Sequence, residues 1–423
     1  QLAGDRLKGT GESPPTPVGG SDAPAKPQAA YEPLIATAFL SLGPKVLAEV
    51  DETKMEMDII DEQIDTTGRA FLGMTIGCAR CHDHKFDPIS ARDYYAMAGI
   101  FRSTRTMEHF RKIAKWWENP IPTAEDLDAK KAFEQQVADA RAAINDRVKV
   151  ANDELRARLG EAAAFPDKPE PQYNDEAKAE LKKIRDALAK LENSPPEMST
   201  AMGVTEGKPV DVGVHVRGSH LTIGEVVPRR FPLVLTTGTQ EPIADDRSGR
   251  LELAQWIASK QNPLTARVIV NRVWRWHFGR GLVRTPDNFG KLGEAPTHPE
   301  LLDWLASRFV EDGWSLKTLH RRIMLSGTYR MSSDHDERAA RVDPTNRSYS
   351  RAPILRLEAE PMRDAMPFVI GRLDTAMGGP AITHVKNREF LFDHTSKDGT
   401  TYDTTRRSVY LPVVRNHLYD FFE

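Results

Sequence analysis

Residues 77–88, with the sequence GCARCHDHKFDP, hold the side chains best suited to chemistry. Cys78 and Cys81 are the only two cysteines of the 423-residue chain, and His82 directly follows the second one. Thiols at this spacing suit a redox-active pair, a zinc site or the covalent attachment of haem. A redox pair of the thioredoxin kind begins a helix after a strand, whereas a helical pattern precedes Cys78. The redox pair is therefore the least favoured of the three.

A zinc site would use Cys78, Cys81, either His82 or His84, and a fourth ligand from elsewhere. Covalent haem attachment needs two thiols that reach the two vinyl groups and an imidazole that ligates the iron. C-x-x-C-H supplies all of these groups in one turn. We therefore expect one haem c attached through Cys78 and Cys81, with His82 as the proximal iron ligand. A zinc site remains the minor alternative.

His84 follows the motif closely, and its imidazole is a candidate contact for a haem propionate. The alternative is a turn at Asp87-Pro88 in which His84 is a partly exposed polar residue, and this alternative is slightly favoured. No catalytic residue is assigned.

The segment VDVGVHVRG, residues 210–218, alternates valines with polar or small residues, which predicts a half-buried strand. Period-two alternation would place His215 and Arg217 together on the face opposite the valines. His215 is then a candidate distal iron ligand, and Arg217 a candidate partner for a propionate. A plain polar outer face is the favoured alternative. Further candidates for the sixth ligand are Met74, Met97, His109 and His220.

Helical patterns dominate the remaining chain. Met57, Ile60, Ile64, Phe71 and Leu72 have helical spacing before the cysteines. Residues 124–193 are rich in Ala, Lys, Glu, Asp and Arg, and a Pro-rich break near 165–171 predicts an antiparallel pair of long helices. Residues 10–33 predict a flexible loop. Short strands are expected at 231–235 and in the segment RRSVYLPVVRN, residues 406–416.

Two further clusters of polar side chains lie in the second half of the chain. The segment around Asn271, Arg272, Trp274, Trp276 and His277 would suit sugar stacking, but helically spaced valines favour a core helix. The acidic residues of RLEAEPMRDA are explained by a helix start and a contact of Glu360 with Arg363. Thr297 and Glu300 predict a capping box for the helix that follows.

Composition restricts the class of protein. The chain has 58 Lys+Arg against 61 Asp+Glu, which gives no support for a nucleic-acid partner. No apolar run predicts a membrane span. Two cysteines cannot build a disulfide framework. Because haem c is assembled outside the cytoplasm, we expect an extracytoplasmic protein whose export signal lies upstream of Gln1.

The segments IDTTGRAFLGMTIGCARCHDHKFDPISARDYYAMAGIFRSTRT and RLELAQWIASKQNPLTARVIVNRVWRWHFGRGL, with RLEAEPMRDA and RRSVYLPVVRN, resemble a known family. This family comprises large planctomycete proteins built from two paired domains of unknown function, often preceded by a cytochrome-c-like domain. The resemblance implies a bacterial, extracytoplasmic protein and does not imply a reaction.

We expect a mainly α fold: two helical domains with a few short β-strands and an inserted antiparallel helical hairpin. The predicted regions are 1–123 with the haem motif, 124–193 as the hairpin, 194–244 as a β-containing connector, and 245–423 as the second domain, truncated at its C-terminus. The leading function is a c-type haem protein in electron transfer or haem-based redox chemistry, with a redox protein or a cytochrome domain as partner. The alternatives are a carbohydrate-binding or carbohydrate-processing protein with an accessory haem, whose partner would be a polysaccharide, and a zinc-stabilised scaffold.

Overall fold

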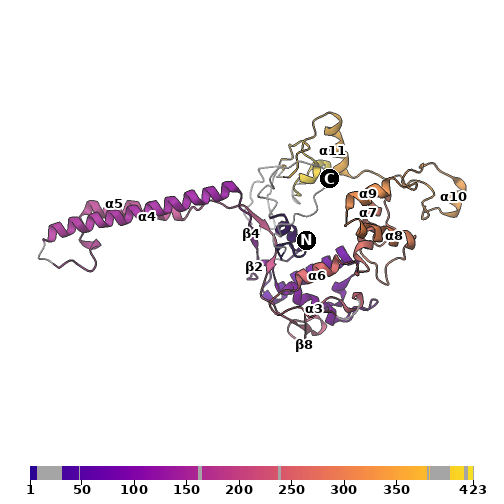
Figure 1. The fold of residues 1–423 in the computed structure, drawn as a ribbon, viewed down its shortest axis with the longest axis horizontal. Helices are drawn as coiled ribbons and strands as arrows, with labels where there is room; N and C mark the ends of the chain where they lie inside the picture. Colours follow the sequence, from indigo (N-terminus) through magenta and orange to yellow (C-terminus); the bar gives the residue numbers. More distant parts are fainter. Residues whose placement is uncertain are drawn as a thin grey trace. The chain divides into compact units, whose positions relative to one another are not determined.

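Figure 1 shows the fold as a computed structural model. It describes residues 1–6, 31–46, 48–160, 164–236, 240–378, 381, 401–413 and 418–422. Helices dominate, and the named strands form four antiparallel pairs. The predicted mainly α fold with a few short strands is therefore confirmed. Most of the loop predicted at 10–33 lies outside the described residues.

Two compact units make up the chain. The first contains Gln1–Trp274 and Arg280–His320, and the second contains Arg275–Gly279 and Arg321–Glu423. This spatial division runs through the region expected to be the second domain. The four-part division of the sequence stays a prediction.

Helix α2 (Glu52–Thr67) leads to the cysteine motif. Its N-cap is Asp51, whose carboxylate accepts a hydrogen bond from the Lys54 amide at 2.9 Å. The helix continues into a π-helix, η4 (Gly68–Leu72), and the chain turns at Gly73 with φ +58°. The helical spacing predicted here is confirmed, because the face of Met57, Ile60, Ile64 and Leu72 is buried. The shorter elements nearby are η1 (Gly4–Arg6), α1 (Glu32–Ala36), η3 (Thr37–Ser41) and η5 (Ile76–Arg80).

Helix α3 (Ala91–Arg102) supplies much of the core of the first unit. A capping box starts it, since Ser90 and Asp93 each bond the other's backbone amide. Helix α6 (Arg250–Ile257) adds Leu253 and Ile257 to the same core. Complete burial of one such side chain contributes about 1.5–3 kcal/mol to folding. The core residues of α3 are Tyr94, Tyr95, Ala96, Met97, Ala98, Ile100 and Phe101.

The predicted helical hairpin is confirmed and is formed by α4 (Ala124–Leu159) and α5 (Asp175–Glu192), with η6 (Glu170–Gln172) between them. The helices lie side by side (Figure 1) and run antiparallel, because Arg141 pairs with Glu192 and Arg147 with Glu180. The hairpin has its own buried cluster, formed by Ala151, Leu155, Tyr173, Ala177 and Leu181. Strands β4 (Glu118–Pro120) and β5 (Thr200–Met202) pair where the chain enters and leaves it.

The other strand pairs are equally short. They are β1 (Thr104–Arg105) with β6 (Thr205–Glu206), β2 (Met107–His109) with β3 (Lys115–Trp116), and β7 (Val212–His215) with β8 (Ile223–Val227).

Two of the strands expected in the first unit differ from the structure. The strand predicted in 210–218 is shorter, because Val216–Gly218 forms a 3₁₀ turn, η7, with Arg217 at φ +54°. The strand predicted at 231–235 is wrong, since Leu233–Leu235 is a 3₁₀ helix, η8. Its neighbour Phe231 bonds the side chain of Gln240 through both its amide and its carbonyl. A side-chain amide thus replaces the partner strand.

The named elements after α6 are all helical. They are α7 (Thr265–Phe278), α8 (Pro299–Glu311), α9 (Leu316–Met324), α10 (Glu337–Val342), α11 (Ala359–Val369), η9 (Ser408–Tyr410) and η10 (Asp420–Phe422).

The predicted start of α8 is wrong by one residue. The N-cap is His298, and its side chain makes no capping bond. Pro299 suits the first helical position because its ring presets φ and no amide is needed there. Thr297, the expected cap, instead donates its hydroxyl to the Leu282 carbonyl at 3.3 Å. The strand expected at 406–416 is also wrong where it is described, because Ser408–Tyr410 is a 3₁₀ helix; residues 414–416 lie outside the described part.

Candidate cofactor-binding site

A 3₁₀ turn displays the two thiols on the surface of the first unit. Element η5 (Ile76–Arg80) buries Ile76 and Ala79 completely. Side chains three residues apart align in a 3₁₀ helix, so Cys78 and Cys81, which caps the turn, share its outer face. Both cysteines are free and exposed. This arrangement suits a ligand that must be bridged by two thiols.

Arg80 anchors the turn from behind. Its guanidinium donates to Asp58 at 2.7 Å and lies 3.3 Å from Asp61, both on α2. Its carbonyl accepts a hydrogen bond from the Tyr95 hydroxyl at 2.9 Å. The residues between the cysteines therefore face the protein, which fixes the direction of the thiols.

The imidazole of His82 is exposed, and its Nδ1 lies 2.7 Å from the Asp83 carbonyl oxygen. A carbonyl can only accept, so Nδ1 carries the proton and donates. In neutral imidazole the lone pair is then on Nε2. Metal-ligating histidines commonly donate their other ring nitrogen to a carbonyl in this way. The geometry of His82 therefore fits an iron ligand that binds through Nε2.

His84 is half-buried as a residue, in line with its predicted partial exposure, and its side chain is only 5% exposed. Its Nδ1 accepts a hydrogen bond from the Asp87 amide at 2.9 Å, and its Nε2 lies 3.0 Å from the Thr75 hydroxyl. The proton is accordingly on Nε2, which donates to Thr75. Both nitrogens organise the turn, as the favoured alternative predicts. A propionate contact would have to replace one of these bonds and stays a prediction.

Asp87 ties the motif to the second half of the chain. Its Oδ1 accepts a hydrogen bond from the Lys291 amide at 2.7 Å. Gly290 packs against the same carboxylate so closely that a Cβ there would lie 2.4 Å from Oδ2. The Phe289 amide also donates to the Gly73 carbonyl at 2.7 Å. The cysteine turn thus lies on a loop held at both ends.

The structure brings His215 near the cysteine turn. Its ring packs on Tyr95 with centroids 4.9 Å apart, and the residue is 4% exposed. Its Nδ1 is buried without a hydrogen-bond partner among the described residues. Burial, together with the positive charges of His220, Arg80 and Arg102, lowers the pKa of His215 to about 4. His215 is therefore neutral at pH 7, the form that binds iron. Its role as distal ligand stays a prediction.

The predicted placement of Arg217 beside His215 on one strand face is wrong. Strand β7 ends at His215, and Arg217 is exposed in the turn that follows, at φ +54°. The next residue, Gly218, lies against Cys81: a Cβ on Gly218 would be 2.6 Å from Sγ. Arg217 is therefore close to the motif through this turn.

The remaining candidates for a sixth iron ligand lie in the hydrophobic core, in an ion pair or in strand β2. Met74 and Met97 are buried in the hydrophobic core. His220 pairs with Asp51, with Nε2 2.9 Å from Oδ2. His109 lies in β2, and its Nδ1 is buried without a partner among the described residues.

The tryptophan-containing helix α7 belongs to the core of the first unit up to Trp274, which is 3% exposed. Asn271 bonds the backbone of Val283 in both directions, at 2.8 and 2.9 Å. Arg272 donates to the Arg69 carbonyl and to Asp287, each at 2.7 Å. The side chains of Asn271 and Arg272 therefore make structural contacts within the protein, in line with the interpretation of α7 as a core helix.

The acidic segment of α11 is also structural. The contact expected between Glu360 and Arg363 is replaced by bonds from Arg363 to Asp364 at 3.2 Å and to the Thr404 carbonyl at 2.6 Å. Asp364 accepts hydrogen bonds from the amide and hydroxyl of Ser408.

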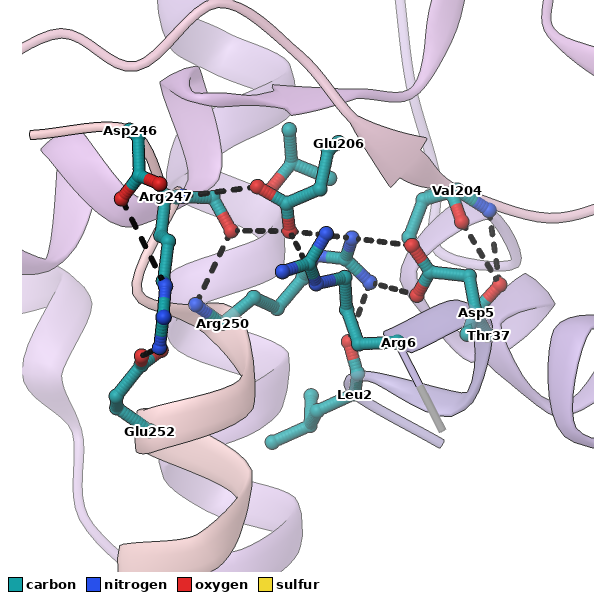
Figure 2. A network of polar contacts seen from close by, with 12 residues as sticks. Leu2, Asp5, Arg6, Thr37, Val204, Glu206, Asp246, Arg247, Arg250 and Glu252 are labelled. Atoms are coloured by element: carbon teal, nitrogen blue, oxygen red, sulfur yellow. Dashed lines mark hydrogen bonds and ion pairs between the residues drawn. The ribbon is translucent and has the colours of Figure 1, made fainter. Parts of the chain in front are cut away.

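A buried polar network is absent from the sequence-based predictions. Figure 2 shows the guanidinium of Arg250, which is 0% exposed, between Asp5 and Glu206. Arg250 bonds both carboxylate oxygens of Asp5, at 2.5 and 2.8 Å, and lies 3.2 Å from Glu206. It also donates to the Leu2 carbonyl at 2.8 Å. The partners are distant in sequence, so no local pattern indicates this network.

No three His, Cys, Asp or Glu side chains of the described segments gather as a metal-binding cluster. None of the helices within those segments is long and apolar enough to cross a membrane.

The described chain is a mainly helical protein whose first unit displays an exposed cysteine turn. Residues 1–106 match the family model described as PSCyt2, a protein of unknown function (DUF1549). Residues 249–423 match the model described as PSD1, a protein of unknown function (DUF1553). No curated protein and no solved structure matches the chain. The paired domains of unknown function that the resemblance predicts are therefore confirmed.

Proposed function

We propose that this protein binds one haem c covalently and works outside the cytoplasm in electron transfer or haem-based redox chemistry. The observation that carries the proposal is the hydrogen bond from His82 Nδ1 to the Asp83 carbonyl, next to two exposed thiols on one face. It leaves Nε2 with the lone pair that an iron ligand needs. Bound haem would supply an iron that exchanges one electron.

Covalent attachment of haem requires little of the protein beyond exposing the two thiols to the vinyl groups. Each thiol would add across one vinyl group: a C–S bond forms, the thiol hydrogen goes to the other vinyl carbon, and nothing is released. The step needs reduced thiols and no oxidant. Cys78 and Cys81 are both free, and Arg80 holds the turn between them against α2. The chain thus orients the thiols before attachment.

Exposure of the motif supports exchange of electrons with a partner. Because Cys78, Cys81 and His82 lie at the surface, a haem held there would have an edge open to a redox protein or a cytochrome domain. An extracytoplasmic location belongs to the same proposal, because haem c is attached outside the cytoplasmic membrane.

The zinc alternative draws less support from the geometry. It requires His82 or His84 and a fourth ligand beside the two thiols. Both nitrogens of His84 are engaged with Thr75 and Asp87, and no three His, Cys, Asp or Glu side chains of the described residues gather as a metal-binding cluster. The carbohydrate alternative relied on sugar stacking against Trp274 and Trp276, with Asn271 and Arg272 beside them. Trp274 is buried, and the polar groups of Asn271 and Arg272 bond the backbone and Asp287, so of this set only the exposed Trp276 is left for stacking. Haem attachment is the function that these contacts favour.

The test is haem content in protein produced with a haem c maturation system. We expect one haem per chain in a pyridine haemochrome spectrum, and haem that stays with the chain in denaturing electrophoresis. Cys81→Ser should weaken attachment. His82→Ala should abolish the native spectrum. His335→Ala, at an exposed histidine remote in sequence from the motif, is the matched control and should leave the spectrum unchanged.

Two results would contradict the proposal. One is wild-type protein that carries stoichiometric zinc and no haem. The other is a haem spectrum that persists in the Cys78→Ser, Cys81→Ser double variant at wild-type yield after denaturation.

A further inference from the structure

The tip of the β7–β8 hairpin is an apolar surface exposed to solvent. Leu221 is 82% exposed, Ile223 54% and Val216 45%. Contiguous exposed apolar surface marks binding sites in soluble proteins. In this hairpin three of them lie within eight residues.

The tip is held in a defined conformation. The Val216 amide donates to the Thr222 carbonyl at 2.9 Å, which closes the loop. The His220 imidazole lies 2.9 Å from the Asp51 carboxylate, which links the tip to the start of α2. The residue before Asp51 is Val50, which is 84% exposed and extends the apolar character of this area. The apolar side chains are therefore displayed on an ordered turn.

This tip adjoins the thiol of Cys81. Gly218 has φ +77°, and its Cα faces the sulfur so closely that a Cβ would lie 2.6 Å from Sγ. A group bonded to Sγ must start next to the hairpin turn. Arg217 is exposed in that turn, and a guanidinium suits a carboxylate such as a propionate. The turn that carries Arg217 and Gly218 thus adjoins the thiol of Cys81.

We propose that the tip of the β7–β8 hairpin covers one part of the porphyrin attached at Cys81, with Leu221 against the ring and Arg217 near a propionate. This inference rests on the proposed haem attachment and specifies which residues shield the cofactor. An apolar cover excludes water from the ring and raises the reduction potential, because ferric haem carries one more positive charge than ferrous haem.

The first test compares reduction potential and circular dichroism of the haem bands in three haem-loaded proteins: wild type, Leu221→Ser and Val150→Ser. Val150, 48% exposed on α4, is the matched control. We expect Leu221→Ser to lower the potential and weaken the haem dichroism, and Val150→Ser to change neither. Arg217→Gln should also lower the potential, and Arg217→Lys should restore most of it.

The second test changes Gly218, whose backbone lies against the Cys81 sulfur. Gly218→Ala brings a methyl group toward Sγ, so we expect a smaller fraction of chains with a thioether at Cys81, measured by mass spectrometry of the haem peptide. Gly160→Ala is the matched control, because Gly160 has φ +81° and no atom within 4 Å of the added Cβ. It should retain wild-type attachment.

The outcomes separate this inference from the proposed function. Wild-type protein without haem overturns both. Wild-type protein with haem, together with Leu221→Ser of unchanged potential and dichroism, overturns the hairpin cover and leaves haem attachment in place.

Discussion

Removing the charge of Asp5 while keeping its shape tests the network around Arg250. In Asp5→Asn the guanidinium loses a carboxylate that it bonds at 2.5 and 2.8 Å, inside a region where Arg250 is 0% exposed. Breaking a buried ion pair by removing one partner costs about 3–5 kcal/mol. Arg250 keeps Glu206 at 3.2 Å and the Leu2 carbonyl at 2.8 Å. We therefore expect the lower end, about 3 kcal/mol.

Hydrogen exchange measures this loss locally. Arg250 is the first residue of α6, so the amides of Arg250–Ile257 report the opening of the network. A loss of about 3 kcal/mol raises the population of the open state on the order of 100-fold, and exchange accelerates by the same factor.

Arg6→Gln is the control for this experiment. Arg6 approaches the same Glu206 at 3.8 Å, but its side chain is 37% exposed. Exposed pairs contribute about 0–1 kcal/mol, so exchange should rise by at most about fivefold. If α6 exchanges no faster in Asp5→Asn than in Arg6→Gln, the reasoning about Arg250 is refuted.

Two further predictions concern the stability of the fold at low pH and the backbone strain at Gly73. In the haem-free protein, unfolded His215 takes up a proton below about pH 6.5 and the folded residue only below about pH 4, so stability should fall as the pH drops between these values. An NMR titration of the His215 ring checks this, and a midpoint near 6.5 would contradict it. Gly73→Ala should destabilise the fold by about 2–5 kcal/mol, from a backbone at φ +58° and a Cβ placed 2.8 Å from Phe289. Gly313→Ala, at φ +67° with nothing within 4 Å, should cost only about 1–2 kcal/mol in denaturant unfolding, and equal losses would argue against crowding at Phe289.

Helices could be predicted because their determinants are local. The spacing of Met57, Ile60 and Ile64 marks the buried face of α2, and the composition of residues 124–193 indicates a solvated hairpin. The strand ends could not be predicted, because Arg217 adopts a positive φ that its residue type does not indicate. Phe231 satisfies its backbone with the side chain of Gln240, which no propensity expresses.

Part of the candidate site could likewise be predicted from the sequence, and part could not. Cys78, Cys81 and His82 are contiguous, so their joint presentation on a turn follows from the motif itself. The approach of Gly218 to Cys81 and of His215 to Tyr95 depends on packing between segments far apart in sequence. The burial of His84 is likewise a result of bonds to Thr75 and Asp87 that only the folded loop creates.

The pairing of β4 with β5 has a consequence for how the chain folds and varies. Pro120 lies opposite Thr200, so the chain enters and leaves the helical hairpin at points about 5 Å apart. The helical hairpin has its own apolar cluster, whose residues all lie between positions 144 and 181. It can therefore form early and shorten the loop that must close before the flanking strands meet. Helices α4 and α5 can lengthen or shorten together by whole turns without moving the cysteine turn, which leaves this insertion free to differ in length among related chains.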